Sequence, residues 1–346
     1  MNFAAVASRC RLYLNLGSNV YVQAPSPVSP AAVGVAFNLG MMVGQIPAGT
    51  FIDRVGTKIG LATIFTAWSL ICILHALAGP GTMIDSIFGG IYGAIPGLPA
   101  ITGAVTIDGA TQAGYSGAPL VRIDGAAAGA ANGLYINTSN SLVRGLSITG
   151  FQQSGILING NGNKVQSSYI GLAPDGSVAG NATRGLMIYE GNNNIVGVDG
   201  DGSGDAAEGN VISGNFYGVW LQGNTSGNRI AGNRIGTNVA GTAAATTTPS
   251  VQAIGVYLFG ATVQGNTIGT NADGVSDTLE RNIISGHSSV GVEVFGATSN
   301  TIAGNYIGTD AAGTAALGLQ GGVNIDNGAT NNVIGTNADG NFDTAE

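Results

Sequence analysis

Cysteine and charge are both scarce in this 346-residue chain, and each shortage excludes something. The two cysteines, Cys10 and Cys72, lie in the first hundred residues, so no disulfide framework supports the rest of the chain. Cys72 sits in an apolar run, which favours a small buried side chain over a reactive thiol. Only 9% of the residues are charged, whereas about a quarter is usual in soluble domains.

The few charges are unevenly divided along the chain. Residues 1–95 hold four basic and two acidic residues, a net of +2, whereas the remainder holds seven basic and 17 acidic residues, a net of −10. Phosphate binding needs clustered lysine and arginine, so we expect no nucleic-acid partner. Cations, neutral glycans and proteins remain as candidate ligands.

Two long stretches near the N-terminus lack charge almost completely. They cover residues 31–52 and 59–84, and each exceeds the roughly 20 residues that cross a bilayer. We therefore expect a helical membrane segment over residues 1–94, with transmembrane helices at about 31–52 and 59–79. The alternative is a pair of buried helices in a soluble domain. Residues 3–22 are a candidate third helix, although Arg9 and Arg11 interrupt them.

The loop between the two stretches carries the pattern G-x-x-x-D-R-x-G-x-K-x-x-L. Its defining residues are Gly49, Asp53, Arg54, Gly56 and Lys58. This pattern resembles the loop between the second and third helices of the major facilitator superfamily, and the resemblance covers about residues 12–80. In that family the loop is cytosolic and its charged residues help to gate transport, a role that the resemblance implies for Asp53, Arg54 and Lys58.

The transporter resemblance covers too little of the chain to predict transport. The family needs about twelve helices and places its substrate between two halves, whereas this chain shows two good helices. We interpret the segment as a membrane anchor or as the remains of a gene fusion. A cytosolic loop with Arg54 and Lys58 obeys the positive-inside rule, so the acidic region should lie outside the cytoplasm, in a bacterial envelope or beyond it.

Short phrases recur throughout the second part of the chain. A glycine followed by apolar-x-apolar opens at Gly133, Gly155, Gly185, Gly218, Gly255, Gly291 and Gly322. Two asparagine phrases, which start at Asn210 and Asn228, return at Asn282 and Asn300, an offset of 72 residues. Such a long unit must hold several coils of chain.

Each phrase predicts a short strand with one apolar face, ended by glycine or asparagine at a sharp corner. Strands of this length must stack to bury that face, and stacked asparagines would form amide ladders about 4.8 Å apart. Crossover chirality makes the coil right-handed. We therefore predict a mainly β chain whose residues 95–346 form a right-handed parallel β-helix, a solenoid. The regular apolar spacing disfavours a disordered tract, and the nonapeptide of a calcium β-roll is absent.

The segment from about Leu98 to Glu346 resembles the parallel β-helix repeat family of the pectin-lyase-like superfamily. Its opening phrase, Leu98-Pro-Ala-Ile-Thr-Gly followed by Ala-Val-Thr-Ile-Asp108, is similar to the first coils of large bacterial surface members. The sequence stops in mid-phrase at Glu346 and shows no terminal cap, so we expect a product truncated at its C-terminus.

One acidic pattern, [D/N]-x-D-G-x-x-D-x-x-E, occurs three times. Its members are Asp199, Asp201, Asp205 and Glu208; Asn271, Asp273, Asp277 and Glu280; and Asn337, Asp339, Asp343 and Glu346. Alternate oxygen ligands, a turn glycine and a later glutamate are what a Ca²⁺ loop requires, although this glutamate comes earlier than in an EF-hand. The alternative is a polar turn whose side chains cap backbone amides. We expect Ca²⁺ as the cofactor.

Catalysis is not predicted. The resemblance extends to pectate lyases and polygalacturonases in architecture only, because their paired aspartates, Gly-His-Gly and Arg-x-Lys are absent. His287 is interpreted as a corner residue and not as an acid or base. Arg229, Arg234 and Arg281 could supply a lyase base, but no acidic cluster is placed beside them by spacing, so no catalytic residue is assigned.

Aromatic residues within the strand phrases are candidate sugar platforms. The predicted ligand-binding set is Tyr217, Trp220 and Tyr257, with Tyr189 nearby; an interior aromatic stack is the alternative. We expect a non-enzymatic surface repeat protein, adhesin-like or glycan-binding and calcium-stabilised, with a polysaccharide or cell-surface component as partner. The alternatives are a polysaccharide lyase or hydrolase and a major facilitator transporter.

Overall fold

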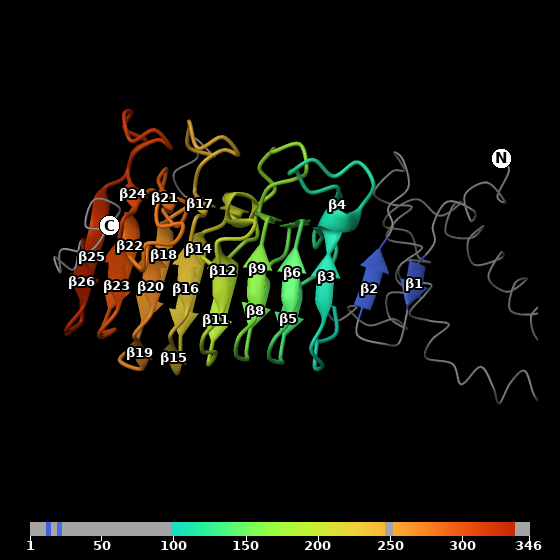
Figure 1. Cartoon of the computed structure of the whole chain (residues 1–346), viewed down its shortest axis with the longest axis horizontal. Helices are drawn as coiled ribbons and strands as arrows, with labels where there is room; N and C mark the ends of the chain where they lie inside the picture. The colour runs from blue at the N-terminus through green and yellow to red at the C-terminus, as the bar shows by residue number, and fades with distance from the viewer. Residues whose placement is uncertain (1–11, 15–18, 23–97, 246–251, 336–346) are drawn as a thin grey trace, which may run out of the picture. The chain divides into compact units, whose positions relative to one another are not determined.

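The computed structural model describes residues 12–14, 19–22, 98–245 and 252–335 (Figure 1). The expected helices at 31–52 and 59–79, the transporter-like residues Gly49, Asp53, Arg54, Gly56 and Lys58, and the third acidic pattern at 337–346 lie outside these residues. In the part that is described, no helix is both long and apolar enough to span a membrane.

Parallel strands from successive coils form three sheets, and the chain visits them in the order sheet I, sheet II, sheet III. Sheet I contains β5 (Leu134–Ile136), β8 (Ser154–Ile158), β11 (Arg184–Tyr189), β14 (Tyr217–Gln222), β18 (Ile254–Phe259), β22 (Val290–Phe295) and β25 (Gly321–Asp326). Sheet III contains β4 (Val121–Asp124), β7 (Leu146–Thr149), β10 (Tyr169–Ile170), β13 (Val211–Ile212), β17 (Arg234–Ile235), β21 (Ile283–Ile284) and β24 (Tyr306–Ile307).

Sheet II has ten strands, which lie side by side across Figure 1. They are β1 (Leu12–Leu14), β2 (Asn19–Val22), β3 (Thr106–Asp108), β6 (Leu142–Arg144), β9 (Lys164–Gln166), β12 (Ile195–Gly197), β16 (Arg229–Ala231), β20 (Thr267–Gly269), β23 (Thr301–Ala303) and β26 (Val333–Ile334). A small extra pair, β15 (Thr225–Ser226) and β19 (Val263–Gln264), lies between sheets I and II along the chain. The predicted mainly β, parallel solenoid is confirmed.

The first two strands fall inside the segment 1–94, for which the sequence predicts helices. β1 pairs antiparallel with β2, and β2 pairs parallel with β3, so residues 12–14 and 19–22 extend sheet II. This differs from the candidate third helix at 3–22. The stretch Asn19-Val-Tyr-Val22 alternates β-branched and aromatic residues, which favours an extended conformation.

The core consists of columns of aliphatic side chains, one per inward position of each strand. In sheet I the register aligns Ile156, Leu186, Val219, Val256 and Val292, all with no exposed surface. Burying each such side chain contributes about 1.5–3 kcal/mol. A single coil could not exclude water from this face, so every coil depends on its neighbours.

Asparagine ladders line the corners, as the recurring phrases predict. Between sheets I and II, each amide Oδ1 accepts from the backbone N–H and the side-chain Nδ2 of the preceding rung, at 2.9–3.0 Å. The six rungs are Asn163, Asn194, Asn228, Asn266, Asn300 and Asn332. A second ladder between sheets II and III contains Asn210, Asn233, Asn282 and Asn305.

Glycine ends two of the sheet II strands, β12 and β20, at a corner that admits no side chain. Gly197 has a φ of 97°, and a Cβ there would lie 1.9 Å from the Ala231 carbonyl oxygen of the next coil. Gly269 has a φ of 102° and the same 1.9 Å approach to Ala303 O. Both the left-handed backbone and the close stacking therefore require glycine.

Two kinds of loop leave the coil in alternation. Hairpin-like loops closed by antiparallel bridges follow sheet III at 172–178, 237–244 and 309–316. Acidic loops join sheets II and III in the intervening coils, at 199–208 and 271–280. One coil of each kind makes the 72-residue unit that the sequence shows, so this unit holds two coils.

Candidate functional site

The two acidic loops, first (199–208) and second (271–280), share one internal geometry. In the first, the Asp199 amide donates to Glu208 Oε2 at 3.0 Å, and the Gly202 amide donates to Asp205 Oδ2 at 3.2 Å. The equivalent bonds of the second loop are from Asn271 N to Glu280 Oε2 at 3.0 Å and from Gly274 N to Asp277 Oδ2 at 3.1 Å. The predicted repeat is therefore also a structural repeat.

Two further carboxylates or amides in each loop cap the backbone two residues on. Asp201 Oδ1 accepts from Ser203 N at 2.7 Å, and Asp273 Oδ1 accepts from Val275 N at 2.8 Å. These are the bonds expected of a polar turn, the alternative to a metal loop. These bonds show that each loop is ordered by its own side chains. A metal ion would have to be bound by the oxygens that do not take part in them.

The structure brings together three of the four predicted ligands in each described loop. One carboxylate oxygen from each of Asp199, Asp205 and Glu208 lies within 4.8 Å of the others, and the same holds for Asp273, Asp277 and Glu280. Asp201 does not join the first cluster. Asn271 lies next to the second cluster, because its Nδ2 donates to Asp273 Oδ2 at 2.8 Å. Two oxygens on opposite sides of one Ca²⁺ are about 4.8 Å apart, so both clusters have a span that the ion could bridge.

Basic side chains from sheet II lie against the loops. Lys164 Nζ is 2.6 Å from Asp199 Oδ2; burial raises the pKa of this carboxyl, but the hydrogen bonds from Lys164 and from the Asp201 amide bring it below its usual value. Burial, followed by the neighbouring carboxylates, raises the pKa of Glu208. The first loop therefore carries mutual repulsion that a cation would relieve.

Arg229 connects the two loops. It lies on β16, between the strands that precede them, and its guanidinium Nη1 donates to the Asp199 carbonyl oxygen at 2.9 Å. Its Nη2 contacts Glu280, whose side chain is fully buried. Arg229 is thus a structural cation and not an available lyase base.

The predicted ligand-binding aromatics lie together on the outer side of sheet I. Val219 and Leu221 point into the core with no exposed surface, while Trp220 lies between them in sequence, points outward and is half-buried. Tyr217, at the start of β14, is also half-buried and packs against Trp220, with ring centroids 4.7 Å apart. Tyr257 faces Trp220 across the β14–β18 pair, with ring centroids 4.9 Å apart. The outward position decides against the interior stack. We call the surface formed by Tyr217, Trp220, Tyr257, Phe259 and Phe295 the aromatic face.

Polar side chains border the aromatic face. The Arg184 guanidinium lies 4.3 Å from the Trp220 ring centroid, and burial lowers its pKa. Beyond Tyr257 the outward row continues with Glu293 and Asn324, whose Nδ2 donates to both carboxylate oxygens at 2.9 and 3.0 Å. Burial and then Glu293 raise the pKa of Tyr257. Tyr189, 38% exposed, lies on β11 at the near edge of this surface.

Sequence reasoning missed Arg184, Glu293, Asn324 and the two phenylalanines of the aromatic face. Glu293, Asn324 and the two phenylalanines lie at outward positions of the glycine phrases, so the alternation that marks Trp220 as outward also marks them. Arg184 precedes its phrase and pairs with Tyr217, so alternation does not mark it. Their grouping depends on how the coils align, because Trp220 pairs with Tyr257 and Tyr257 with Glu293 only through the register of sheet I.

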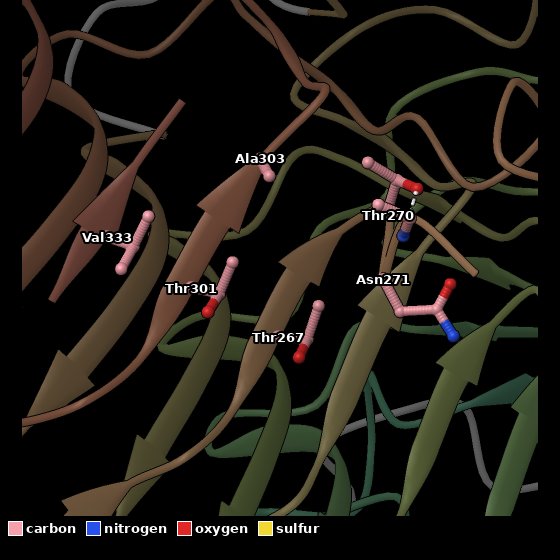
Figure 2. Close-up of a pocket in the computed structure, with 7 residues that line it drawn as sticks. Thr267, Thr270, Asn271, Thr301, Ala303 and Val333 are labelled. Carbon is pink, nitrogen blue, oxygen red and sulfur yellow. Dashed lines mark hydrogen bonds between the residues drawn. The ribbon is translucent and has the colours of Figure 1, made fainter. Parts of the chain in front are cut away.

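A shallow pocket that was not predicted lies on the outer side of sheet II. Figure 2 shows Thr267, Thr301 and Val333 projecting in a row from β20, β23 and β26. Thr270, Asn271, Ala272 and Ala303 complete its lining. The threonines occupy the same place in the two Asn-Thr-Ile phrases at 266–268 and 300–302, which is the signal that the sequence offered. The pocket borders the second acidic loop through Asn271.

His287 and Arg281 hold structural positions. His287 lies 3% exposed at the corner before sheet I, and burial lowers its pKa to about 3, so it is neutral at physiological pH. The Arg281 guanidinium lies over the Tyr306 ring at 4.2 Å, and its Nε donates to the Gly304 carbonyl oxygen. Among the described residues, the structure places neither His287 nor Arg281 in an acid–base pair. Comparison with protein-family models, curated proteins and solved structures finds no match to this chain.

Proposed function

We propose that the solenoid is a non-enzymatic surface repeat protein that binds a glycan on its aromatic face and is stabilised by calcium bound to acidic side chains. The observation that carries this proposal is the grouping of Tyr217, Trp220 and Tyr257 on the outer side of adjacent strands. Half-buried aromatic rings combine a large apolar area with little conformational freedom, which suits them to stack on the apolar faces of sugar rings.

Polar atoms around the rings support the same ligand class. Sugar hydroxyls need donors and acceptors beside the stacking surface, and Arg184, Gln222 and Glu293 supply both at its borders. Because the rings follow neighbouring coils, an extended glycan lying along the stack would contact several of them at once.

Trp220→Ala should lower glycan affinity at least tenfold on an array of bacterial and plant polysaccharides, without release of products. The matched control is Tyr306→Ala, which removes a half-buried ring with its own cation–π contact from sheet III. We expect this control to change affinity by less than twofold. Equal losses in both variants, or no binding by the wild type, would reject the aromatic face as the site. Release of shorter or unsaturated sugars would instead favour a polysaccharide lyase or hydrolase.

The proposal includes the location and the finer classification of the protein. We propose a right-handed parallel β-helix resembling the pectin-lyase-like superfamily, anchored in a bacterial membrane by residues 31–52 and 59–79 with the solenoid outside the cytoplasm. Crossover chirality and the position of Arg54 and Lys58 support this arrangement. Protease added to intact cells should digest exposed loops of the solenoid; full protection until the cells are lysed would argue against the topology.

A further inference from the structure

The two acidic loops differ in two oxygen atoms, although their backbones are built alike. In the first loop, Asp205 is 4% exposed and its Oδ1 has no hydrogen-bond partner among the described residues. In the second loop, the equivalent Asp277 Oδ1 accepts from the Thr270 hydroxyl at 3.3 Å. A buried carboxylate oxygen without a donor is costly, so it points to a partner such as a bound ion.

The donor is missing from the first loop because of a single residue. Thr270 follows Gly269 at the end of β20, and the position 72 residues earlier, after Gly197 at the end of β12, is Val198. Val198 is 2% exposed and carries no hydroxyl. A hydroxyl therefore donates to the aspartate Oδ1 in the second loop, and in the described part of the chain no such donor is present in the first.

The second difference concerns the glutamate. Glu280 of the second loop contacts the guanidinium of Arg229, which lies one coil away on sheet II. The residue at the equivalent place for the first loop is Lys164, but its ammonium pairs with Asp199. Among the described residues, Glu208 Oε1 meets no donor, while its Oε2 accepts from the Asp199 amide. The protein cation thus pairs with the glutamate in the second loop, whereas in the first loop it pairs with Asp199 and, within the residues that the structure describes, leaves the glutamate without one.

We propose that the first acidic loop binds one divalent cation, of the Ca²⁺ type, through Asp205 Oδ1, Glu208 Oε1 and the carboxylate of Asp199. One carboxylate oxygen from each of these three residues lies within 4.8 Å of the others, a span that fits a single ion, and backbone or water oxygens would complete the six to eight ligands that Ca²⁺ takes. The second loop binds no ion, because the Thr270 hydroxyl already donates to Asp277 Oδ1 and the Arg229 guanidinium lies against Glu280 in a salt bridge, where a second cation would be repelled. This assignment rests on the proposed calcium binding and does not depend on the glycan.

Calorimetric titration of the chelator-treated full chain with CaCl₂ tests the assignment. We expect Asp205→Asn to remove one Ca²⁺ site, whereas the matched variant Asp277→Asn in the second loop keeps affinity within threefold of the wild type. Val198→Thr supplies the missing hydroxyl without removing a charge. We expect it to weaken Ca²⁺ binding about tenfold while leaving the circular dichroism spectrum unchanged, so it tests the site even if Asp205→Asn folds poorly.

Each other outcome overturns the assignment. Loss of the site in Asp277→Asn but not in Asp205→Asn would move the ion to the second loop, and the proposed calcium binding would survive. No Ca²⁺ binding by the wild type would remove both the assignment and the calcium part of the proposed function, with glycan binding untouched. Unchanged affinity in Val198→Thr and Asp205→Asn together would show that Asp205 is not a ligand.

Discussion

Two corners of the solenoid make the same turn with different side chains. Between sheets I and II, asparagine occupies six consecutive rungs from Asn163 to Asn332, and each bonds to the next. Between sheets III and I, Asn181 bonds to Asn215, but the next two rungs are Gln252 and His287. The corner between sheets I and II therefore carries a complete ladder, and the corner between sheets III and I carries an interrupted one.

The interruption shows what asparagine contributes. Its amide reaches a rung above and a rung below while bonding to the backbone of its own corner. Gln252, one methylene longer, bonds instead to the backbone, with Oε1 accepting from Gly214 N at 2.6 Å and Nε2 donating to Gly236 O at 3.0 Å. His287 leaves its Nδ1 without a partner among the described residues. The coils still stack, because the aliphatic columns continue across the gap, so the ladder adds stability to a topology that the core already imposes.

The largest effect should come from breaking the complete ladder at its centre. Asn228 Oδ1 accepts two bonds from Asn194, and its Nδ2 donates to Gly191 O and to Asn266 Oδ1. Asn228→Ala leaves several buried groups unsatisfied at about 1–3 kcal/mol each, so we expect urea unfolding to show a loss of about 3–5 kcal/mol. The control is Asn332→Ala at the exposed end of the ladder, with less than half that loss. Equal losses of unfolding free energy in the two variants would mean that the contribution of a rung does not depend on how deeply it is buried.

Acid should destabilise the interrupted corner next. Burial lowers the pKa of His287 from 6.5 to about 3, so the unfolded chain takes up a proton first as the pH falls below 6.5. The stability from a neutral His287 is complete above pH 6.5 and declines between pH 6.5 and about 3, by up to about 1.4 kcal/mol per pH unit. Free energies of unfolding from urea titrations at pH 7 and pH 5 should differ by about 2 kcal/mol. The same difference in His287→Asn would assign the effect to other groups.

The smallest effect should come from repairing the rung. At pH 7, His287→Asn restores the ladder residue, and we expect unfolding to require about 1 kcal/mol more than in the wild type, in line with one net hydrogen bond. His287→Ala is the control that removes the ring without adding an amide, and it should be less stable than either. A variant His287→Asn weaker than the wild type would show that the ring's packing against Gly236 and Gly255 matters more than the missing bond.

Local patterns in the sequence were sufficient to predict the strands and the corners. Alternation identified inward and outward positions such as Leu221 and Trp220, and repeated asparagines predicted the ladders. The number of sheets could not be obtained in this way, because no single phrase records how many corners separate it from the next. The helices at 31–52 and 59–79 stay predictions.

The candidate sites were predictable to the extent that they are local. Asp205 and Glu208 come together because they share one loop. The contact between Arg229 and Glu280 joins residues in different coils, and coils differ in length because of their loops, so their register could not be counted from the sequence. The same reason hid the approach of Glu293 to Tyr257, whereas the offset of 72 residues from Asn215 already indicates that His287 is a corner residue.

The alternation of hairpin and acidic loops sets a regular spacing between equivalent loops along the solenoid. With coils about 4.8 Å apart, equivalent loops recur at intervals of about 10 Å on one side of the stack. A partner that is itself a regular polymer could match that spacing at several points, and each additional contact would act at high local concentration. Adding whole two-coil units to the solenoid would then increase avidity, because each unit repeats the same loops and needs no new kind of binding residue.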